Sequence, residues 1–327
     1  APKPYWDLYD PVTDIDLTGY DGTKKMPTGV NEFAAPYGGE QSGYSDIDEP
    51  PSAAQARRLT HAYMACVSYV DQQVGKIIDV LERLGLADST IVVLFGDHGF
   101  HLADHGAFWA KHSNFDHATR TPLIVRVPGM QKTGTFDTPV GLVDVFPTLV
   151  DLCSLPYPKQ PNGLFLEGTS LLPLVEDPTQ PWKKGVFSQY QRRIWKKNSA
   201  GDTVDINNPG NGIGYSIRTK RYRYTEWWRT KTTAKDSKGN YTDRDVKLFN
   251  APEMKELYDY NIDPNETTNL VNESSHSQLV SELAALLAGG EGWTNTASAP
   301  AAKPSYALSV TSGNGGTAAG GGTFEHG

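Results

Sequence analysis

The stretch Ile91–Asp116 is the feature that most constrains what this chain can fold into. It opens on an apolar run, Ile91–Phe95, in which three residues are β-branched, and it breaks at Gly96 before presenting Asp97 and His98. A short apolar run that stops at a glycine is typical of a buried strand. Open α/β sheets bind ligands beyond the carboxyl ends of their strands, so we expect a functional site where this strand ends.

Histidines gather in the same stretch: five of the chain's eight lie between positions 98 and 117. Hard divalent cations prefer carboxylate oxygens, and zinc accepts both imidazole and carboxylate. Where the backbone turns at a strand end, Asp97 and His98 can face one ion, so both are candidate metal ligands. A turn carboxylate beside a surface imidazole is the alternative. We expect His101 and His117 to be structural or to lie on the surface.

Four more side chains are candidates for catalysis or substrate binding. Lys111 lies in an aromatic segment, where an amine can stabilise an anionic oxygen or protonate a leaving group. Alternatively its stem packs on Trp109 and its amine reaches water. His105 and His112 can transfer protons or donate to an anionic substrate. Arg192 is the first residue of a cationic run after an expected strand, and it either binds an acidic sugar or lies on a solvated face.

Length and composition exclude some classes of protein. The 327 residues suffice for one large α/β domain or two smaller ones, and the net charge of -8 argues against a general nucleic-acid binder. A local cationic pocket can still bind an anionic substrate. No run of about 18 apolar residues occurs, so no membrane span is predicted. Cys66 and Cys153 lie in apolar helical patterns, and we expect buried free thiols. The start at Ala1, without Met or a signal pattern, indicates a mature form or an excised fragment.

Apolar residues at intervals of three and four predict a long helix from Ser52 to Leu84, with Gly85 in the left-handed conformation that ends many helices. A helix that leads into an apolar strand is typical of a βαβ unit, so we expect 91–95 to be a parallel core strand. A second short strand is expected at 122–127. Asp144 is expected to cap the helix that follows.

The chain changes character near Val186. Strand patterns with hairpin spacing, followed by one amphipathic helix, predict a small antiparallel α+β subdomain. The expected strands are 186–190, 214–219, 222–227 and 257–260, and the expected helix is 277–287. Beyond Gly289 the sequence is rich in Gly, Thr, Ala and Ser, which is typical of a linker, and 306–310 is expected to form one further strand.

Several motifs, in order along the chain, resemble the type I sulfatases and, within them, the iduronate-2-sulfatase-like group. They are Gly96–Gly99, Leu102–Gly106, Trp109–Asp116, Thr121–Ile124 and Val143–Leu149. Further pieces of the same pattern are Ala65–Asp71, Ser188–Tyr190, Gly214–Thr219 and Glu256–Asp259. The resemblance covers roughly residues 55–275. The ordered set makes it specific, since any single motif is common.

The resemblance implies an α/β fold: an alkaline-phosphatase-like mixed sheet flanked by helices, with a smaller C-terminal antiparallel α+β subdomain. It implies hydrolysis of sulfate esters of a sulfated sugar or glycan, with a formylglycine and one Ca²⁺ or Mg²⁺, in a secreted or periplasmic protein. Asp97 and His98 would be two of the metal's ligands. Lys111 would contact the sulfate and assist the leaving alcohol. His105 and His112 would lie near the substrate.

Two elements of the family pattern do not occur in the sequence. The nucleophile motif (Cys or Ser, any residue, Pro, a small residue, Arg) is absent, and no early strand carries the paired aspartates that complete the metal site. The resemblance therefore implies an N-terminally truncated sulfatase, inactive as a fragment. The expected domains are 1–183, the C-terminal part of the catalytic domain; 184–288, the small subdomain; 289–303, a linker; and 304–327, the start of a β module.

Two other functions stay open. A phosphodiesterase or phosphatase of the same superfold also carries Asp-His-Gly at a strand end, but it binds two zinc ions, so a metal analysis separates it from a sulfatase. A non-catalytic binding module is the other alternative, supported by the missing nucleophile motif and the appended β module. The sequence makes no prediction of the oligomeric state.

Overall fold

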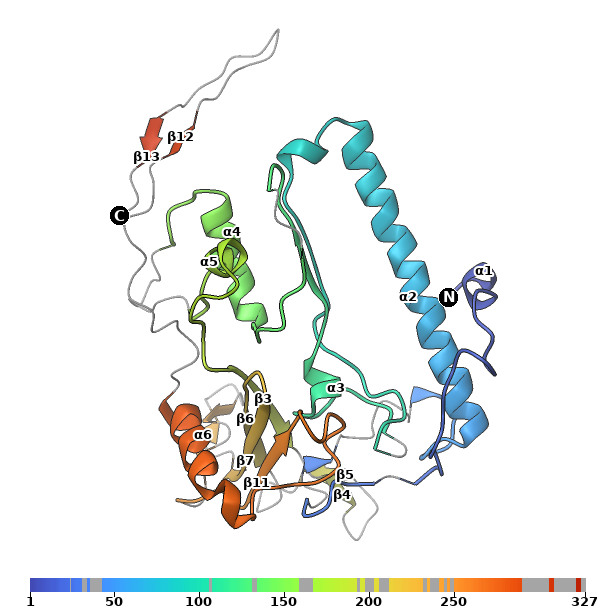
Figure 1. The fold of residues 1–327 in the computed structure, drawn as a ribbon. Coiled ribbons are helices and arrows are strands. Elements are labelled where there is room, and N and C mark those ends of the chain that lie inside the picture. The colour runs from blue at the N-terminus through green and yellow to red at the C-terminus, as the bar shows by residue number, and fades with distance from the viewer. Residues whose placement is uncertain are drawn as a thin grey trace. The chain divides into compact units, whose positions relative to one another are not determined.

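The computed structural model describes most of the chain (Figure 1). The described residues are 1–23, 25–30, 34–35, 43–105, 108–130, 134–158, 167–192, 195–197, 203–205, 212–231, 234–235, 241–243, 246–247, 250–289, 306–308 and 322–324. They form two compact units, each described by itself. The first unit holds Ala1–Thr133, Ser188–Ile217 and Arg221–Ala284; the second holds Gly134–Phe187, Arg218–Lys220 and Ala285–Gly327.

The long helix predicted from the apolar period is confirmed as α2 (Ala53–Arg83). Ser52 caps it, because its hydroxyl accepts from the Gln55 backbone N–H at 3.3 Å. The Gln55 side chain in turn accepts from the Ser52 N–H at 2.8 Å, which completes a capping box. Gly85 follows with a φ of +66°, the left-handed conformation that the sequence predicts there.

The strand expected to be buried and parallel is β1 (Val92–Phe95), and it pairs antiparallel with β2 (Leu123–Arg126). Both expectations are wrong for the described residues. Leu94 and Phe95 are exposed, and no strand precedes β1 in the described part of the chain that could lie parallel to it. Antiparallel pairing follows because β2 is reached by a returning loop, without a crossover.

Two glycines let the loop after β1 run close to the backbone that returns to β2. The Gly96 N–H donates to the carbonyl of Pro122 at 3.1 Å, and the Gly99 N–H donates to the carbonyl of Ala118 at 2.8 Å. A Cβ added at Gly99 would lie 2.1 Å from the carbonyl oxygen of His117. Only glycine fits so close an approach, so this position fixes the path of the loop.

The predicted antiparallel sheet is present, with the strand order β10-β7-β6-β3 and β11 also paired to β7. Its strands are β3 (Val186–Arg192), β6 (Gly212–Arg218), β7 (Tyr222–Lys231), β10 (Val246–Lys247) and β11 (Met254–Asp259). The expected hairpin is confirmed, because β6 and β7 are hydrogen-bonded neighbours. The expected final helix is α6 (Ser277–Gly289). Trp227, Tyr224 and Leu257 are fully buried in this sheet.

In the second unit, the helix expected after Asp144 is α4 (Val145–Leu152), but Asp144 does not cap it with its side chain. Its carboxylate instead accepts from the backbone N–H groups of Gly141 at 2.9 Å and Thr169 at 2.8 Å, and it pairs with Lys183. The expectation of a side-chain cap is therefore wrong, because Gly141, Thr169 and Lys183 hold this carboxylate instead.

The expectation of buried thiols is also wrong, since Cys66 and Cys153 are free and exposed. Ala65 is a buried residue of α2. Cys66 is the next residue, about 100° around the helix, and so it points away from the direction in which Ala65 is buried. Cys153 is the residue at which α4 ends.

The remaining elements are short. They are α1 (Lys3–Trp6), η3 (Ala87–Ser89), α3 (Asp116–Thr119), η4 (Leu142–Asp144), α5 (Leu172–Glu176), η5 (Ser274–His276), β4 (Trp195–Lys197), β5 (Thr203–Asp205), β8 (Ala234–Lys235), β9 (Tyr241–Asp243), β12 (Tyr306–Leu308) and β13 (Gly322–Phe324). The strand expected at 306–310 is β12, which pairs with β13. None of the described helices combines the length and apolar character needed to cross a bilayer. The expected linker lies almost wholly outside the described residues.

Candidate functional site

Asp97 and His98 follow the end of β1, as predicted from the sequence. The His98 Nδ1 lies 2.8 Å from the carbonyl oxygen of Gly99, and because a carbonyl only accepts, this nitrogen carries the ring proton. In the neutral ring the His98 Nε2 therefore holds the lone pair, and it lies 3.5 Å from Oδ2 of Asp97. Two ligands of one divalent cation, bound at about 2.0–2.4 Å, lie roughly 3–4 Å apart, so this pair fits a metal site.

The other predicted site residues lie farther along the chain. Lys111 and His112 are half-buried, and His112 lies near Tyr190 with ring centroids 6.0 Å apart. Arg192 is the last residue of β3, and its side chain lies outside the described part of the structure. The predicted convergence of these side chains on Asp97 stays a prediction.

His105, predicted as a catalytic group, is buried: its side chain is 3% exposed. Its ring lies against Phe115, with centroids 4.7 Å apart. Burial lowers the pKa of His105 to about 4, although the neighbouring Asp104 carboxylate opposes this shift. The imidazole is therefore neutral near pH 7 and keeps a lone pair on one nitrogen.

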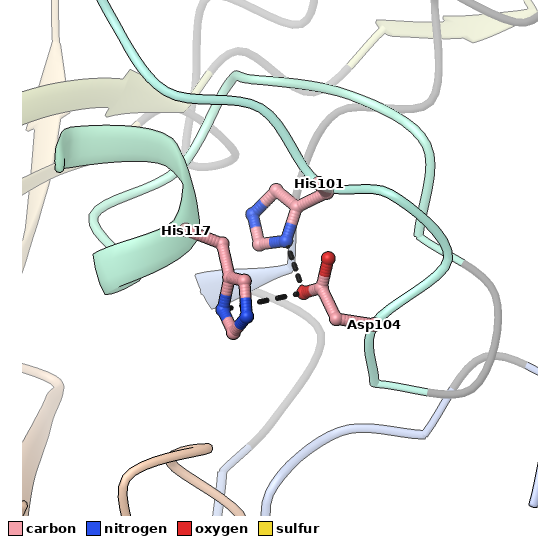
Figure 2. A group of neighbouring side chains, drawn as sticks. All are labelled: His101, Asp104 and His117. Carbon is pink, nitrogen blue, oxygen red and sulfur yellow. Dashed lines mark hydrogen bonds and ion pairs between the residues drawn. The ribbon is translucent and has the colours of Figure 1, made fainter. Parts of the chain in front are cut away.

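A cluster that the sequence did not predict surrounds Asp104 (Figure 2). The His101 Nδ1 and the His117 Nδ1 both face Oδ2 of Asp104, the latter at 3.7 Å. The second nitrogen of His101 lies 2.8 Å from the Ser113 hydroxyl. His101 is fully buried. From the sequence, we expect His101 and His117 to be structural or to lie on the surface. No motif in the sequence predicts that both face the Asp104 carboxylate.

The Asp104 carboxylate is held as an anion. Burial alone would raise the pKa of Asp104, but the hydrogen bond from His101 and the positive charge that nearby imidazoles can carry hold it below the ordinary value. The order Asp104, His101, Ser113 matches that of a hydrolytic triad. Ser113 is 6% exposed, however, and is not among the residues that line the cavity beside Asp104, which argues against its direct contact with a substrate.

A second buried network borders this cluster through Glu266. The Glu266 carboxylate accepts from the Arg223 guanidinium, from the Tyr260 hydroxyl at 2.6 Å and from the Asp116 backbone N–H at 2.9 Å. Arg223 also pairs with Glu256 at 3.5 Å, and all three charged side chains are at most 2% exposed. Burial would raise the pKa of Glu266, but Arg223 and these hydrogen bonds hold it below its ordinary range.

A cavity of about 540 Å³ adjoins the cluster. Asp104, His105 and His117 line one side of it, and the segments 16–20 and 25–27 line another. The backbone N–H of Lys25 donates to the His105 carbonyl at 2.7 Å, which holds the second of these segments in place.

Two family models match this sequence. The model described as Sulfatase matches residues 20–155, and the model described as N-sulphoglucosamine sulphohydrolase, C-terminal, matches residues 103–236. Iduronate 2-sulfatase of Homo sapiens is 35% identical over 266 residues, which cover 68% of this chain and 46% of that protein. The mouse enzyme (Mus musculus) is 34% identical over 267 residues, covering 69% of this chain and 46% of that protein.

The chain belongs to the type I sulfatase family. Within the family it is iduronate-2-sulfatase-like, which confirms the resemblance seen in its motifs. The chain spans about half the length of the curated relatives it matches, 46% in both cases. Sulfatases of this family generally use a metal ion.

Solved structures confirm the alkaline-phosphatase-like α/β fold. A phosphonate monoester hydrolase from Silicibacter pomeroyi aligns with a TM-score of 0.60 at 22% identity, over 89% of this chain and 52% of that one. A protein solved with its substrate, D-glucosamine-2-N,6-O-disulfate, gives 0.52 at 23% identity over 78% of this chain and 44% of that one. A 2-O GAG sulfatase gives 0.53 at 25% identity over 73% of this chain and 44% of that one.

Proposed function

We propose that the protein to which these residues belong hydrolyses a sulfate ester of a sulfated sugar or glycan. The observation that carries the proposal is the pair Asp97 and His98 at the end of β1, inside a stretch that the sulfatase family model matches from residue 20 to residue 155. The relatives named as iduronate 2-sulfatases and the structure with a disulfated glucosamine support a sulfated saccharide as the substrate class.

Asp97 and His98 would hold a divalent cation, Ca²⁺ or alternatively Mg²⁺. Their fit rests on the Gly99 carbonyl, which fixes the proton on the far nitrogen of His98 and leaves the lone pair toward Asp97. Both side chains are open to solvent, 85% for Asp97 and 38% for His98, so further ligands have room to approach. Such an ion polarises an ester oxygen and neutralises charge that develops on it.

Lys111 is proposed to contact the sulfate and to assist the leaving alcohol. Its ammonium carries the charge that stabilises an anionic oxygen, and it can give a proton to the alkoxide as the sulfur–oxygen bond breaks. His112 is proposed to bind the substrate beside it, and Arg192 to bind an acidic sugar group. The burial of His105, at 3% exposure, favours a positioning role for this imidazole over direct proton transfer.

The nucleophile is proposed to be a formylglycine, which supplies the hydroxyl that attacks sulfur. Neither Cys66 nor Cys153 stands in the motif from which the family makes this group, so we assign it to a part of the protein outside these 327 residues. The family's usual setting supports a secreted or periplasmic location.

The test is release of inorganic sulfate from a panel of sulfated saccharides by the natural full-length protein, compared with its Lys111→Ala and Asp97→Asn variants. We expect sulfate release by the wild type, at least a ~100-fold loss in kcat for Lys111→Ala, and loss of metal together with activity for Asp97→Asn. No sulfate release from protein that carries formylglycine and metal would overturn the proposal. Phosphate release from a phosphodiester by protein with two zincs would establish the alternative enzyme.

A further inference from the structure

Two buried imidazole nitrogens face one carboxylate oxygen without bonding to it. The His105 Nε2 lies 3.8 Å and the His117 Nδ1 lies 3.7 Å from Oδ2 of Asp104. Both nitrogens are buried, and neither has a hydrogen-bond partner among the described residues. The separations exceed the 2.7–3.2 Å of a hydrogen bond by about half an ångström or more, so these two buried polar atoms are unsatisfied, which is unfavourable unless another group bonds to them.

Three side chains at this place are spaced so that they could hold a metal ion. One ligand atom each from His105, His117 and Glu266 lie within 4.8 Å of one another. Two ligands of a tetrahedral zinc, each bound at about 2.0–2.1 Å, lie roughly 3.3 Å apart, so a modest inward shift would bring the three onto one ion. Asp104 does not belong to this group, but it faces both imidazoles.

Charge at the cluster also favours a cation. Arg223 pairs with the buried carboxylate of Glu266, whereas the side chains that face Asp104 are imidazoles. Lys25, which lines the cavity, pairs with Asp21. A divalent ion held by His105 and His117 would balance the charge of Asp104.

The groups behind the imidazoles are arranged as around bound metals. Asp104 faces both rings, and its carboxylate is held by His101 at one oxygen and by the Leu102 backbone N–H at the other, at 3.0 Å. His101 is in turn fixed by the Ser113 hydroxyl at 2.8 Å. A carboxylate behind a ligating imidazole orients the ring before the ion arrives.

We propose that His105, His117 and Glu266 form a zinc site beside Asp104, separate from the pair Asp97 and His98. Two imidazoles with a carboxylate select zinc over calcium or magnesium, which prefer oxygen ligands alone. The cavity of about 540 Å³ along Asp104, His105 and His117 gives the ion a path to the site. This assigns His105 to the ion in place of the proton transfer predicted from its sequence context, and it does not depend on the proposed hydrolysis.

The test is metal binding by the purified natural protein after chelator treatment, with Zn²⁺ as the probe and Co²⁺ as its spectroscopic substitute. We expect Zn²⁺ retained after dialysis, a rise in the melting temperature with Zn²⁺, and the intense visible bands of tetrahedral Co²⁺. His117→Asn should weaken Zn²⁺ binding more than about 100-fold, and His101→Asn, which removes only the group behind Asp104, by roughly 10–100-fold.

Two control variants separate this site from others. His276→Asn changes a histidine beside Glu273 on η5, outside the cluster, and should leave Zn²⁺ affinity unchanged. His98→Asn should also leave the tetrahedral Co²⁺ spectrum intact. Equal Zn²⁺ binding by folded wild type and His117→Asn, loss of the ion in His98→Asn, or no Zn²⁺ retained by the wild type would each overturn the proposal. If His117→Asn does not fold, the wild-type Co²⁺ spectrum decides, since weak octahedral bands contradict the assignment.

Discussion

Replacing Arg223 by methionine should destabilise the first unit strongly. The Arg223 side chain is 2% exposed and stands between the carboxylates of Glu266 (0% exposed) and Glu256 (1%). Its guanidinium also lies over the Tyr258 ring, 4.6 Å from the centroid. Methionine keeps much of the side-chain volume, so the change removes the charge and its hydrogen bonds more than the packing.

The magnitude follows from what is left behind. Removing one partner of a buried ion pair costs about 3–5 kcal/mol, because the remaining charge stays buried without compensation. Here one guanidinium serves two carboxylates, so the loss should reach the upper part of that range. Arg221→Met is the matched control: Arg221 binds Asp259 through two nitrogens, at 2.8 and 2.6 Å. The Arg221 side chain is 48% exposed, and its partner Asp259 (2% exposed) also accepts from the Asn261 backbone N–H at 3.1 Å, so that change should cost less than Arg223→Met.

The pH dependence gives a second, independent check. In the wild type, the pKa of Glu266 lies below its ordinary value of 4.5, so the stability from this pair is present above 4.5 and is lost as the pH falls through the lower, folded-state pKa. In Arg223→Met the largest cause that opposes burial is gone and only the hydrogen bonds from Tyr260 and the Asp116 N–H remain, so the pKa of Glu266 should rise. The penalty in the variant then disappears as the pH falls, so the difference between the two proteins should narrow toward about pH 4.5.

Urea unfolding followed by tryptophan fluorescence measures both effects, because Trp227 is fully buried and its indole N–H donates to Glu256. The reasoning is refuted if Arg223→Met is as stable as Arg221→Met near neutral pH. It is also refuted if the destabilisation of Arg223→Met grows as the pH falls, since that would mean the stranded carboxylates are not its source.

Three further predictions use the same unfolding assay or the turnover assay. Gly99→Ala should lower the free energy of unfolding by about 2 kcal/mol or more, because the added Cβ would lie 2.1 Å from a carbonyl oxygen. Its control is Gly75→Ala in α2, where an added Cβ meets nothing within 4 Å, and this change should raise the free energy of unfolding by about 0.5–1 kcal/mol. Ser52→Ala should cost about 0.5–2 kcal/mol through the lost capping box, and Ser281→Ala in α6 should cost less, since its hydroxyl caps nothing. Lys111→Ala should lower sulfate release at least ~100-fold with unchanged urea stability, and equal turnover by both proteins would remove Lys111 from the proposed reaction.

The sequence predicts well the elements whose causes are local. The α2 helix was predictable to within a residue or two because its period, its Ser52 cap and its terminal Gly85 all act over a few residues. The hairpin of β6 and β7 was predictable for the same reason. Burial of β1 was not, because an apolar run reads the same whether or not another element covers it, and Phe95 is 48% exposed here.

The buried cluster lay beyond sequence reasoning because its contacts are long-range. The Asp116 N–H donates to the Glu266 carboxylate, 150 positions farther along the chain, and no periodicity or motif spacing in the sequence predicts that contact. His105 adopts a φ of +49°, an uncommon conformation for a histidine, and its side chain is buried, at 3% exposure. The one local signal was the density of histidines between positions 98 and 117, which marked the segment but not which of its members meet.

The loop between β1 and β2 carries Asp97 and His98 as well as His105 and His117, so residues of both proposed sites belong to one segment of backbone. Four backbone hydrogen bonds join the two sides of this loop. They run from the N–H of Gly96 to Pro122 (3.1 Å), Gly99 to Ala118 (2.8 Å), His101 to Ala110 (2.7 Å) and Ala103 to Phe108 (2.8 Å). The exposed Asp97 and His98 lie between the first two of these hydrogen bonds, and the buried cluster begins at His101. These hydrogen bonds fix the path of the loop on both sides of Asp97 and His98. Under the proposed function, the buried cluster would therefore support the loop, and the exposed strand end would hold the metal that acts on the substrate.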